Sequence, residues 1–245
     1  MFDLTGRHAL VTGATGGIGG AIAQALHARG ATVALSGTRE ERLAELAEKL
    51  GERAHVVPAN LSDMDAADAL PGRAQEAMGG LDVLVANAGV TRDGLMLRMK
   101  PDDFDAVLDV NLRATWRLAK ACLKPMMKAR RGRLIGIGSV VGSTGNPGQT
   151  NYAASKAGLV GMFKSLGAEV GSRGVTANVI APGFVATAMT DALTDEQRGA
   201  IDAQIPAGRM GTPADIAGAA VYLASDEAAY VNGATLHVNG GMAML

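Results

Sequence analysis

Short apolar runs alternate with amphipathic stretches along the whole chain. The runs at residues 8–11, 32–35, 54–57, 83–86, 134–137, 175–180 and 235–238 are typical of strands buried on both faces. Between them, residues 18–29, 39–50, 101–123 and 151–171 have the apolar spacing of helices. Strands that are apolar throughout and alternate with helices predict a parallel sheet covered on both faces. We therefore expect a doubly wound α/β fold with a seven-stranded parallel sheet.

The pattern predicts a single domain over residues 1–245, because no repeat, linker or low-complexity run interrupts it. A formal net charge of −1 gives no sign of binding to nucleic acid or to an anionic membrane. No window is apolar for the roughly 18 residues that a membrane span needs, so we expect a cytoplasmic protein. The four histidines lack the spacing of metal ligands, and the single cysteine, Cys122, excludes an internal disulfide.

A glycine-rich loop joins the first strand to the first helix. Its residues are Gly13, Ala14, Thr15, Gly16, Gly17, Ile18 and Gly19, a wider spacing than the common G-x-G-x-x-G. Such glycines let a pyrophosphate approach the N-terminus of the helix, where free N–H groups and the helix dipole favour an anion. The loop could also be a purely structural turn. Its place in the first β–α unit favours a Rossmann-like fold that binds a dinucleotide.

The end of the second strand bears on the choice of dinucleotide. An acidic residue there would accept a hydrogen bond from the adenosine ribose and disfavour a 2′-phosphate. The residues are instead Ser36, Gly37, Thr38 and Arg39. Arg39 can pair with a phosphate and Thr38 can donate its hydroxyl, which favours NADP(H). The alternative is that Arg39 is a solvated residue at the start of a helix.

The segment from Tyr152 to Lys156 indicates acid–base chemistry. The two residues are four apart, so they share one face of a helix, and Ser139 lies upstream. A phenol with a pKa of about 10 is a poor acid at neutral pH, and a neighbouring ammonium would lower that pKa. The Tyr-x-x-x-Lys spacing alone is a weak signal; together with the glycine loop and Ser139 it is strong.

These motifs resemble those of the short-chain dehydrogenase/reductase family. They stand together with Asn87-Ala88-Gly89 after the fourth strand, Asn111 in a long helix, and Pro182-Gly183 followed by Thr187. Residues 91–99, 145–149 and 237–242 are similar to the bacterial 3-oxoacyl-[acyl-carrier-protein] reductases within that family. Two departures are Gly16, where many such reductases carry an arginine, and Ala86 before Asn87.

The resemblance implies roles for individual residues. Ser139 and Tyr152 would hold and protonate a substrate carbonyl, Lys156 would lower the pKa of Tyr152, and Asn111 would hold a proton-relay water. The implied NADP(H) contacts are Gly13, Ala14, Thr15, Gly16, Gly17, Ile18, Gly19, Thr38, Arg39, Asn60, Leu61, Asn87, Ala88, Gly89, Tyr152, Lys156, Pro182, Gly183, Val185 and Thr187.

The resemblance also implies a substrate lid at about residues 187–210, a homotetramer, and docking of acyl carrier protein at Arg130 and Arg173. The expected activity is NADPH-dependent reduction of 3-oxoacyl groups on that carrier in fatty-acid biosynthesis. Two alternatives remain: the same chemistry on acetoacetyl-CoA or another ketone or secondary alcohol, and a dinucleotide-binding regulator without catalysis. An intact Ser139, Asn111, Tyr152 and Lys156 argues against the regulator.

Overall fold

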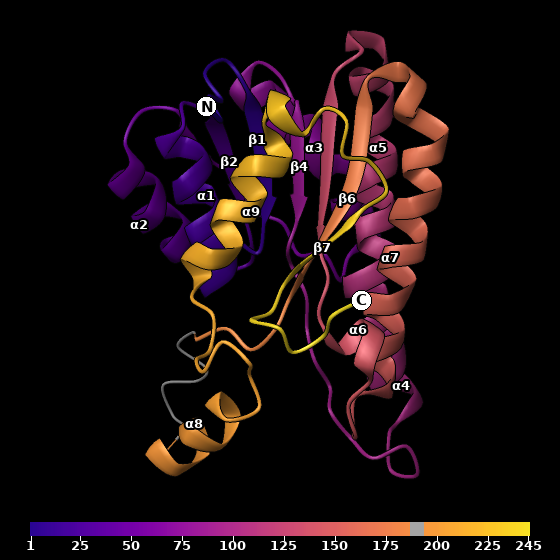
Figure 1. Cartoon of the computed structure of the whole chain (residues 1–245). Helices are drawn as coiled ribbons and strands as arrows, with labels where there is room; N and C mark the ends of the chain where they lie inside the picture. Colours follow the sequence, from indigo (N-terminus) through magenta and orange to yellow (C-terminus); the bar gives the residue numbers. More distant parts are fainter. Residues whose placement is uncertain (187–193) are drawn as a thin grey trace.

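Seven parallel strands form one sheet in the order β3-β2-β1-β4-β5-β6-β7 (Figure 1). A computed structural model of the chain describes residues 1–186 and 194–245. The strands are β1 His8–Thr12, β2 Thr32–Ser36, β3 Ala54–Val56, β4 Val83–Ala86, β5 Gly132–Ile137, β6 Val175–Pro182 and β7 Thr235–Val238. The sheet confirms the predicted doubly wound, Rossmann-like fold.

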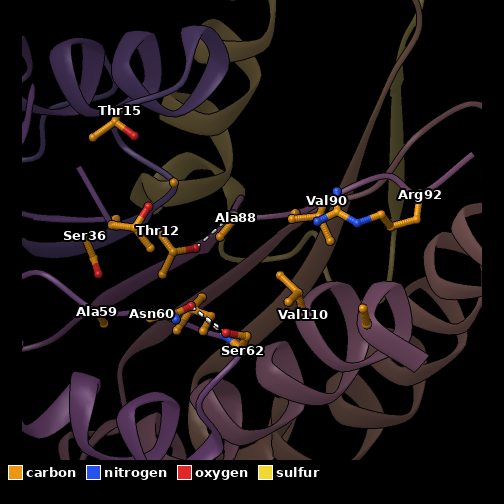
Figure 2. Close-up of a pocket in the computed structure, with 16 residues that line it drawn as sticks. Thr12, Thr15, Ser36, Ala59, Asn60, Ser62, Ala88, Val90, Arg92 and Val110 are labelled. Atoms are coloured by element: carbon orange, nitrogen blue, oxygen red, sulfur yellow. Dashed lines mark hydrogen bonds between the residues drawn. The ribbon is translucent and has the colours of Figure 1, made fainter. Parts of the chain in front are cut away.

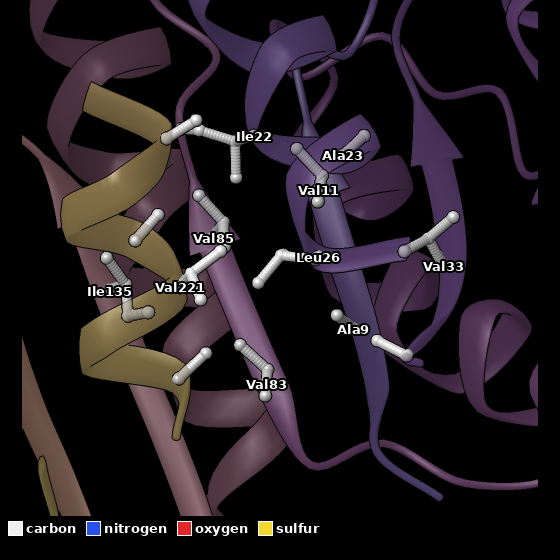
Figure 3. Close-up of a cluster of buried hydrophobic side chains, with 14 of the residues drawn as sticks. Ala9, Val11, Ile22, Ala23, Leu26, Val33, Val83, Val85, Ile135 and Val221 are labelled. Carbon is white, nitrogen blue, oxygen red and sulfur yellow. The ribbon is translucent and has the colours of Figure 1, made fainter. Parts of the chain in front are cut away.

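Helices cover both faces of this sheet and bury two apolar clusters. On one face lie α1 (Gly17–Ala28), α2 (Glu40–Leu50) and α9 (Pro213–Ala224). Figure 3 shows Ile22 and Leu26 of α1 and Val221 of α9 packed against Val11 and Val85 of the sheet. On the other face lie α3 (Met64–Met78), α5 (Ala114–Ala129) and α7 (Thr150–Val170). Cys122 is buried in this second cluster.

Two long helices, the short helix over Val141–Thr144 and one interruption were absent from the predicted pattern. Helices α3 and α9 were not predicted, although α9 begins with a reciprocal cap between Thr212 and Asp215 and with Pro213 in its first turn. The helix predicted over residues 101–123 is α4 (Pro101–Leu108), then a π-helical turn (Asp109–Arg113), then α5. That turn contains Asn111.

The two ends of the sheet carry different connecting segments. At the carboxyl ends of the strands lie the glycine loop, the loop after β4, the short helix α6 (Val141–Thr144) and helix α8 (Asp195–Asp202), as Figure 1 shows. The 3-10 turns Gly171–Arg173 and Asp226–Ala228 lie at the amino ends. No helix within the described residues is long and apolar enough to cross a membrane.

Candidate active site

A pocket of about 350 Å³ opens at the carboxyl ends of β1, β2, β3 and β4 (Figure 2). The glycine loop contributes Gly13 and Thr15, and further residues come from the ends of the neighbouring strands and from α4. The predicted cofactor residues that line it are Gly13, Thr15, Thr38, Asn60, Leu61, Ala88 and Gly89. In open α/β sheets, ligands bind in the crevice outside the carboxyl ends of the strands, where the strand order reverses. Here the order reverses between β1 and β4.

The glycine loop is held from the β4 side by Asn87. The Asn87 amide donates to the carbonyl of Thr12 at 2.9 Å and to that of Gly13 at 3.2 Å. Gly13 has φ of +65°, and a Cβ on it would lie 2.7 Å from the Asn87 amide nitrogen. A Cβ on Gly19 would lie 2.2 Å from the Gly13 carbonyl oxygen. Glycine is therefore required at both positions by close packing within the protein.

The N-terminus of α1 has the chemistry of an anion site. Its N-cap, Gly16, offers no side-chain cap, and no acidic residue stands in the first turn of this fully described helix. The first-turn N–H groups therefore lack a side-chain acceptor, and the helix dipole favours an anion there. At the end of β2, the hydroxyl of Ser36 is buried without a hydrogen-bond partner among the described residues and lines the same pocket. Both features fit a phosphate-bearing dinucleotide.

Arg39 reaches from the end of β2 to Thr15 of the glycine loop. Its guanidinium donates to the Thr15 carbonyl at 2.8 Å and to the Thr15 hydroxyl at 3.0 Å. Arg39 is exposed and forms no ion pair with a described residue, so no described acid neutralises its charge. This cation stands at the end of β2, where a 2′-phosphate of the adenosine ribose would lie.

Tyr152 and Ser139 come together from α7 and the end of β5. Ser139 lies close enough to Tyr152 to lower the pKa of the phenol. Burial of the phenol has the larger effect and raises the pKa, and the carboxylate of Asp93 raises it further. The net direction is upward, opposite to the one that the Tyr152–Lys156 spacing led us to expect.

Lys156 is buried beside Tyr152. Its ammonium donates to the Ile137 carbonyl at 2.7 Å and lies 5.5 Å from the centre of the Tyr152 ring. Burial lowers the pKa of Lys156 to about 8, because the charged form loses its hydration. A lysine with this pKa exchanges its proton readily near neutral pH, which suits a group that resupplies a neighbouring acid.

Asn111 lies in the π-helical turn and is fixed by the backbone of Val90. Its side-chain oxygen accepts from the Val90 N–H at 2.8 Å, and its amide donates to the Val90 carbonyl and to the Ser155 hydroxyl. A Cβ on Gly89 would lie 3.1 Å from the Asn111 side-chain oxygen and 3.7 Å from the Lys156 ammonium. The structure thus brings Asn111 and Lys156 to the same position beside Gly89. π-Helical turns of this kind occur frequently at functional sites.

Three residues beside the site were not predicted from the sequence. Asn151 is fully buried and donates to the carbonyls of Arg92 and Asp103 while accepting from the N–H of Tyr152. The Gln149 amide donates to the Asp93 carboxylate at 3.0 Å. These bonds tie the loop after β4 to the start of α7 and so position Tyr152. The only available signal was an Asn beside Tyr152 at the start of a helix.

The remaining predicted contacts fall into two groups. Pro182, Gly183 and Val185 continue from the end of β6, where Val185 pairs with Gly211 in a short parallel bridge. Thr187 and the first part of the predicted lid, through residue 193, lie outside the described residues. In the described part of the lid segment, the N–H of Ala207 donates to the Gly240 carbonyl. That part therefore rests on the C-terminal segment.

The predicted docking residues Arg130 and Arg173 lie at the opposite end of the sheet. Arg130 ends α5 in a left-handed conformation with φ of +51°, and its guanidinium donates to the Ser172 carbonyl at 3.0 Å. Arg173 follows α7, whose 21 residues span about 30 Å and begin beside Tyr152. The structure brings the two arginines together and separates both from the Tyr152 of the same chain.

Comparison with known proteins agrees with this geometry. A family model described as enoyl-(acyl carrier protein) reductase matches residues 13–243. Nodulation protein G of Rhizobium sp. strain N33 is 58% identical over 245 residues, which is the whole of both chains. The 3-oxoacyl-[acyl-carrier-protein] reductase FabG of Vibrio harveyi is 52% identical over 243 residues, 99% of this chain and 100% of that protein.

A solved structure of a candidate gluconate dehydrogenase from Agrobacterium tumefaciens superposes with a TM-score of 0.93 at 32% identity. The match covers 100% of this chain and 99% of that one. The chain belongs to the short-chain dehydrogenase/reductase family of oxidoreductases.

Proposed function

We propose that the protein reduces 3-oxoacyl groups carried by acyl carrier protein to 3-hydroxyacyl groups, with NADPH as the reductant, in fatty-acid biosynthesis. The observation that carries the proposed chemistry is the position of Tyr152 between Ser139, which influences its pKa, and the buried ammonium of Lys156. The substrate class is supported by the 52% identity with the Vibrio harveyi carrier-protein reductase over nearly the whole chain.

The two hydroxyls are placed to act on one carbonyl oxygen. When bound, the reduced nicotinamide supplies a hydride to the carbonyl carbon. Ser139 and Tyr152 then donate hydrogen bonds to the oxygen as negative charge grows on it, and such donors act more strongly in a dry site than in water. Tyr152 gives up its proton to this oxygen. Its raised pKa keeps the phenol protonated at neutral pH, so the acid is present before the reaction begins.

Lys156 and Asn111 would restore the proton. The Lys156 ammonium lies beside the Tyr152 ring, and the ionised phenol left after proton transfer would be stabilised by that charge. Asn111 and the backbone of Val90 form a polar path next to Lys156. We place the relay water in this path.

The preference for NADPH would come from Arg39 with Thr15 and Thr38. Arg39 already spans from β2 to the glycine loop through Thr15, and its guanidinium keeps donors for a phosphate. Gly16 leaves that position without a cation, so Arg39 would carry the charge recognition. Gly13–Gly19, Asn60, Leu61, Asn87–Gly89 and the segment from Pro182 to Thr187 would hold the rest of the cofactor.

The carrier and the assembly complete the proposal. The basic pair Arg130 and Arg173 would receive the acidic surface of the carrier protein, because opposite charges steer encounter and fix orientation. We further propose that the protein is a homotetramer, in which α5 and α7 pack against other copies.

The test follows the loss of reduced-nicotinamide absorbance with three substrates: acetoacetyl-carrier protein, acetoacetyl-CoA and gluconate-derived keto acid. NADH replaces NADPH as the cofactor control. The proposal predicts fast turnover of the carrier-linked substrate with NADPH and at least about tenfold slower turnover with NADH. Equal rates with acetoacetyl-CoA, or turnover of the sugar-derived substrate alone, would keep the reductase chemistry and contradict the carrier substrate. Tight cofactor binding with no turnover of any carbonyl would favour a regulator.

A further inference from the structure

The loop after β4 brings a carboxylate, that of Asp93, to the start of α7. The N–H of Gly94 donates to the Gly148 carbonyl at 2.8 Å, so the backbones of the two segments are joined directly. Next to this bond, the Gln149 amide donates to the Asp93 carboxylate at 3.0 Å. Gln149 is the residue that precedes the first turn of α7. The two bonds therefore fix the carboxylate beside that turn.

The Asp93 carboxylate acts on Tyr152. Tyr152 stands three residues after Gln149, about one helical turn, so the two side chains lie on the same side of α7. Burial is the larger cause of the raised pKa of Tyr152, and the charge of Asp93 raises this pKa further. A carboxylate that acts on the phenol also acts on a charge placed where the phenol meets a substrate.

No described cation neutralises Asp93. Its side chain is exposed, its hydrogen-bond donor Gln149 is a neutral amide, and it forms no ion pair with a described residue. The adjacent cation, Arg92, donates instead to the carbonyl of Thr91. Gln149 is held in place in turn by the amide of Asn146, which donates to its side-chain oxygen at 3.0 Å. The site therefore keeps a negative charge beside Tyr152.

The chemistry of a 3-oxoacyl compound places its acyl carbon within this field. Three bonds of about 1.5 Å or less join the ketone carbon to an oxygen on the acyl carbon. When the ketone oxygen meets Ser139 and Tyr152, the acyl carbon must lie close to the phenol as well. In a thioester or an ester this group is neutral, whereas in a free 3-oxo acid it is a carboxylate. Asp93 repels the carboxylate and leaves the neutral group unaffected.

We propose that Asp93 is a specificity-determining residue, which makes the active site select neutral 3-oxoacyl thioesters and esters over free 3-oxo acids. The selection comes from repulsion of the wrong substrate, a device that specific binding sites commonly use. This inference rests on the proposed reductase function. It adds which chemical form of the substrate is rejected and which residue rejects it.

A purely structural role would also suit the position of Asp93. Helix α7 has no acidic residue in its first turn and no side-chain cap at Gln149, so a carboxylate nearby would stabilise its N-terminus. Loss of that role would lower activity on charged and uncharged substrates alike. The two roles are therefore separated by two substrates that differ only in the charge on the acyl carbon.

Ethyl acetoacetate and acetoacetate are such a pair, because they share the ketone and differ in this charge. With NADPH, kcat/KM is measured on both for the unmodified protein and for Asp93→Asn, which keeps an oxygen acceptor for Gln149. A second variant, Gln149→Lys, leaves Asp93 in place and gives it a cation. The matched control is Asp102→Asn, which removes an exposed carboxylate from the first turn of α4.

The measured quantity is the preference, the ratio of kcat/KM on the ester to kcat/KM on the acid. Two like charges about 6 Å apart near a protein surface change binding by about tenfold or more, so the preference should fall at least about fivefold in Asp93→Asn. Gln149→Lys should lower it in the same direction, and Asp102→Asn should change it by less than about twofold. An unmodified protein that reduces the acid as fast as the ester would overturn the inference.

Failure of the proposed function would give a different result. Unmodified protein that reduces neither ethyl acetoacetate nor acetoacetyl-carrier protein would refute the reductase function, and the inference with it. An active protein whose preference stays the same in both Asp93→Asn and Gln149→Lys would refute selection by Asp93 alone. Equal losses on the ester and the acid in Asp93→Asn would assign this residue the structural role.

Discussion

Polar groups at the amino ends of the strands, which we call the amino edge of the sheet, are mostly paired with one another. Several of those at the carboxyl ends, the carboxyl edge, lack such partners among the described residues. At the amino edge, Asp82 pairs with His8 and Arg131, and Asp226 pairs with Arg7 and Arg133. Burial pushes the pKa of Asp82 upward, but hydrogen bonds from His8 and Arg131 outweigh it and hold the pKa below its usual value. These groups satisfy one another, and Asp82 stays charged.

At the carboxyl edge, several polar groups are buried without a charged or hydrogen-bonding partner in the described part of the chain that would offset the cost of burial. The Ser36 hydroxyl has no partner among the described residues, and burial without a charge partner lowers the pKa of Lys156 and raises that of Tyr152. Groups that cost stability without a ligand and shift their pKa by burial are expected where ligands bind and protons move. The comparison assigns a structural role to the charge pairs of Asp82 and Asp226, and a chemical role to Ser36, Tyr152 and Lys156.

Among changes at the carboxyl ends of the strands, removal of the Tyr152 hydroxyl should have the largest effect, a loss of turnover. Tyr152→Phe should lower turnover by about 10²–10⁴, because the general acid is lost, while cofactor affinity is retained. Stopped-flow turnover and fluorescence titration of NADPH would measure the two quantities. The matched control is Tyr230→Phe, which changes a fully exposed phenol. Unchanged turnover in Tyr152→Phe would show that another group is the acid.

Loss of Arg39 should have a smaller effect, confined to one cofactor. Hydrogen bonds to charged groups are worth about 1.5–3 kcal/mol, so Arg39→Ala should weaken NADPH binding by about 10- to 100-fold and leave NADH binding nearly unchanged. Calorimetric titration with both cofactors measures this. Arg42→Ala serves as the control, because Arg42 lies in the first turn of α2, shortly after Arg39 at its N-cap, and pairs with Glu45. A parallel loss for both cofactors would place Arg39 away from the 2′-phosphate.

Replacement of Lys156 should have the smallest energetic effect of the three changes. It should be favourable, because the substitution is expected to stabilise the folded protein. The pKa of Lys156 falls from 10.5 to about 8 on folding, a cost of roughly 3 kcal/mol at neutral pH. Lys156→Met removes that cost but leaves the Ile137 carbonyl unpaired, so we expect a net gain of about 1–2 kcal/mol in the free energy of unfolding.

The stability of the unmodified protein should change with pH in a matching way. Between about pH 8 and pH 10.5 the unfolded chain holds the Lys156 proton and the folded chain does not, so this contribution to stability rises with pH. Urea unfolding of the unmodified protein and of the Lys156→Met variant at pH 7 and at pH 10 measures this. The gain in the free energy of unfolding that the substitution gives should be smaller at pH 10 than at pH 7. An equal or larger gain at high pH would mean that Lys156 is not buried as a charge.

The sequence predicted the strands better than it predicted the helices. Strands buried on both faces carry continuous apolar runs, which periodicity detects directly. Helix α3 contains Pro71, and α9 is so rich in alanine that it lacks a clear polar face. The π-helical turn at Asn111 could not be predicted, because it depends on the fit of that side chain to Val90 across the fold.

Candidate site residues that form motifs could be named from the sequence, whereas residues that contact the site only through packing could not. Ser139, Tyr152 and Lys156 are recognisable by their spacing, whereas Asn151 and Asp93 matter only because the loop after β4 folds onto the start of α7. The direction of the Tyr152 pKa also depends on burial, which spacing does not contain. The separation of Arg130 and Arg173 from Tyr152 likewise becomes visible only when the length of α7 is laid out in space.

The central claim is that chemistry and carrier recognition occupy different ends of the molecule. The most direct test is kcat/KM of Arg130→Glu with Arg173→Glu on acetoacetyl-carrier protein and on a small free ketone ester. The account predicts a loss of about tenfold or more on the carrier-linked substrate and less than about twofold on the free ketone. Equal losses on the two substrates, or no loss on either, would contradict it.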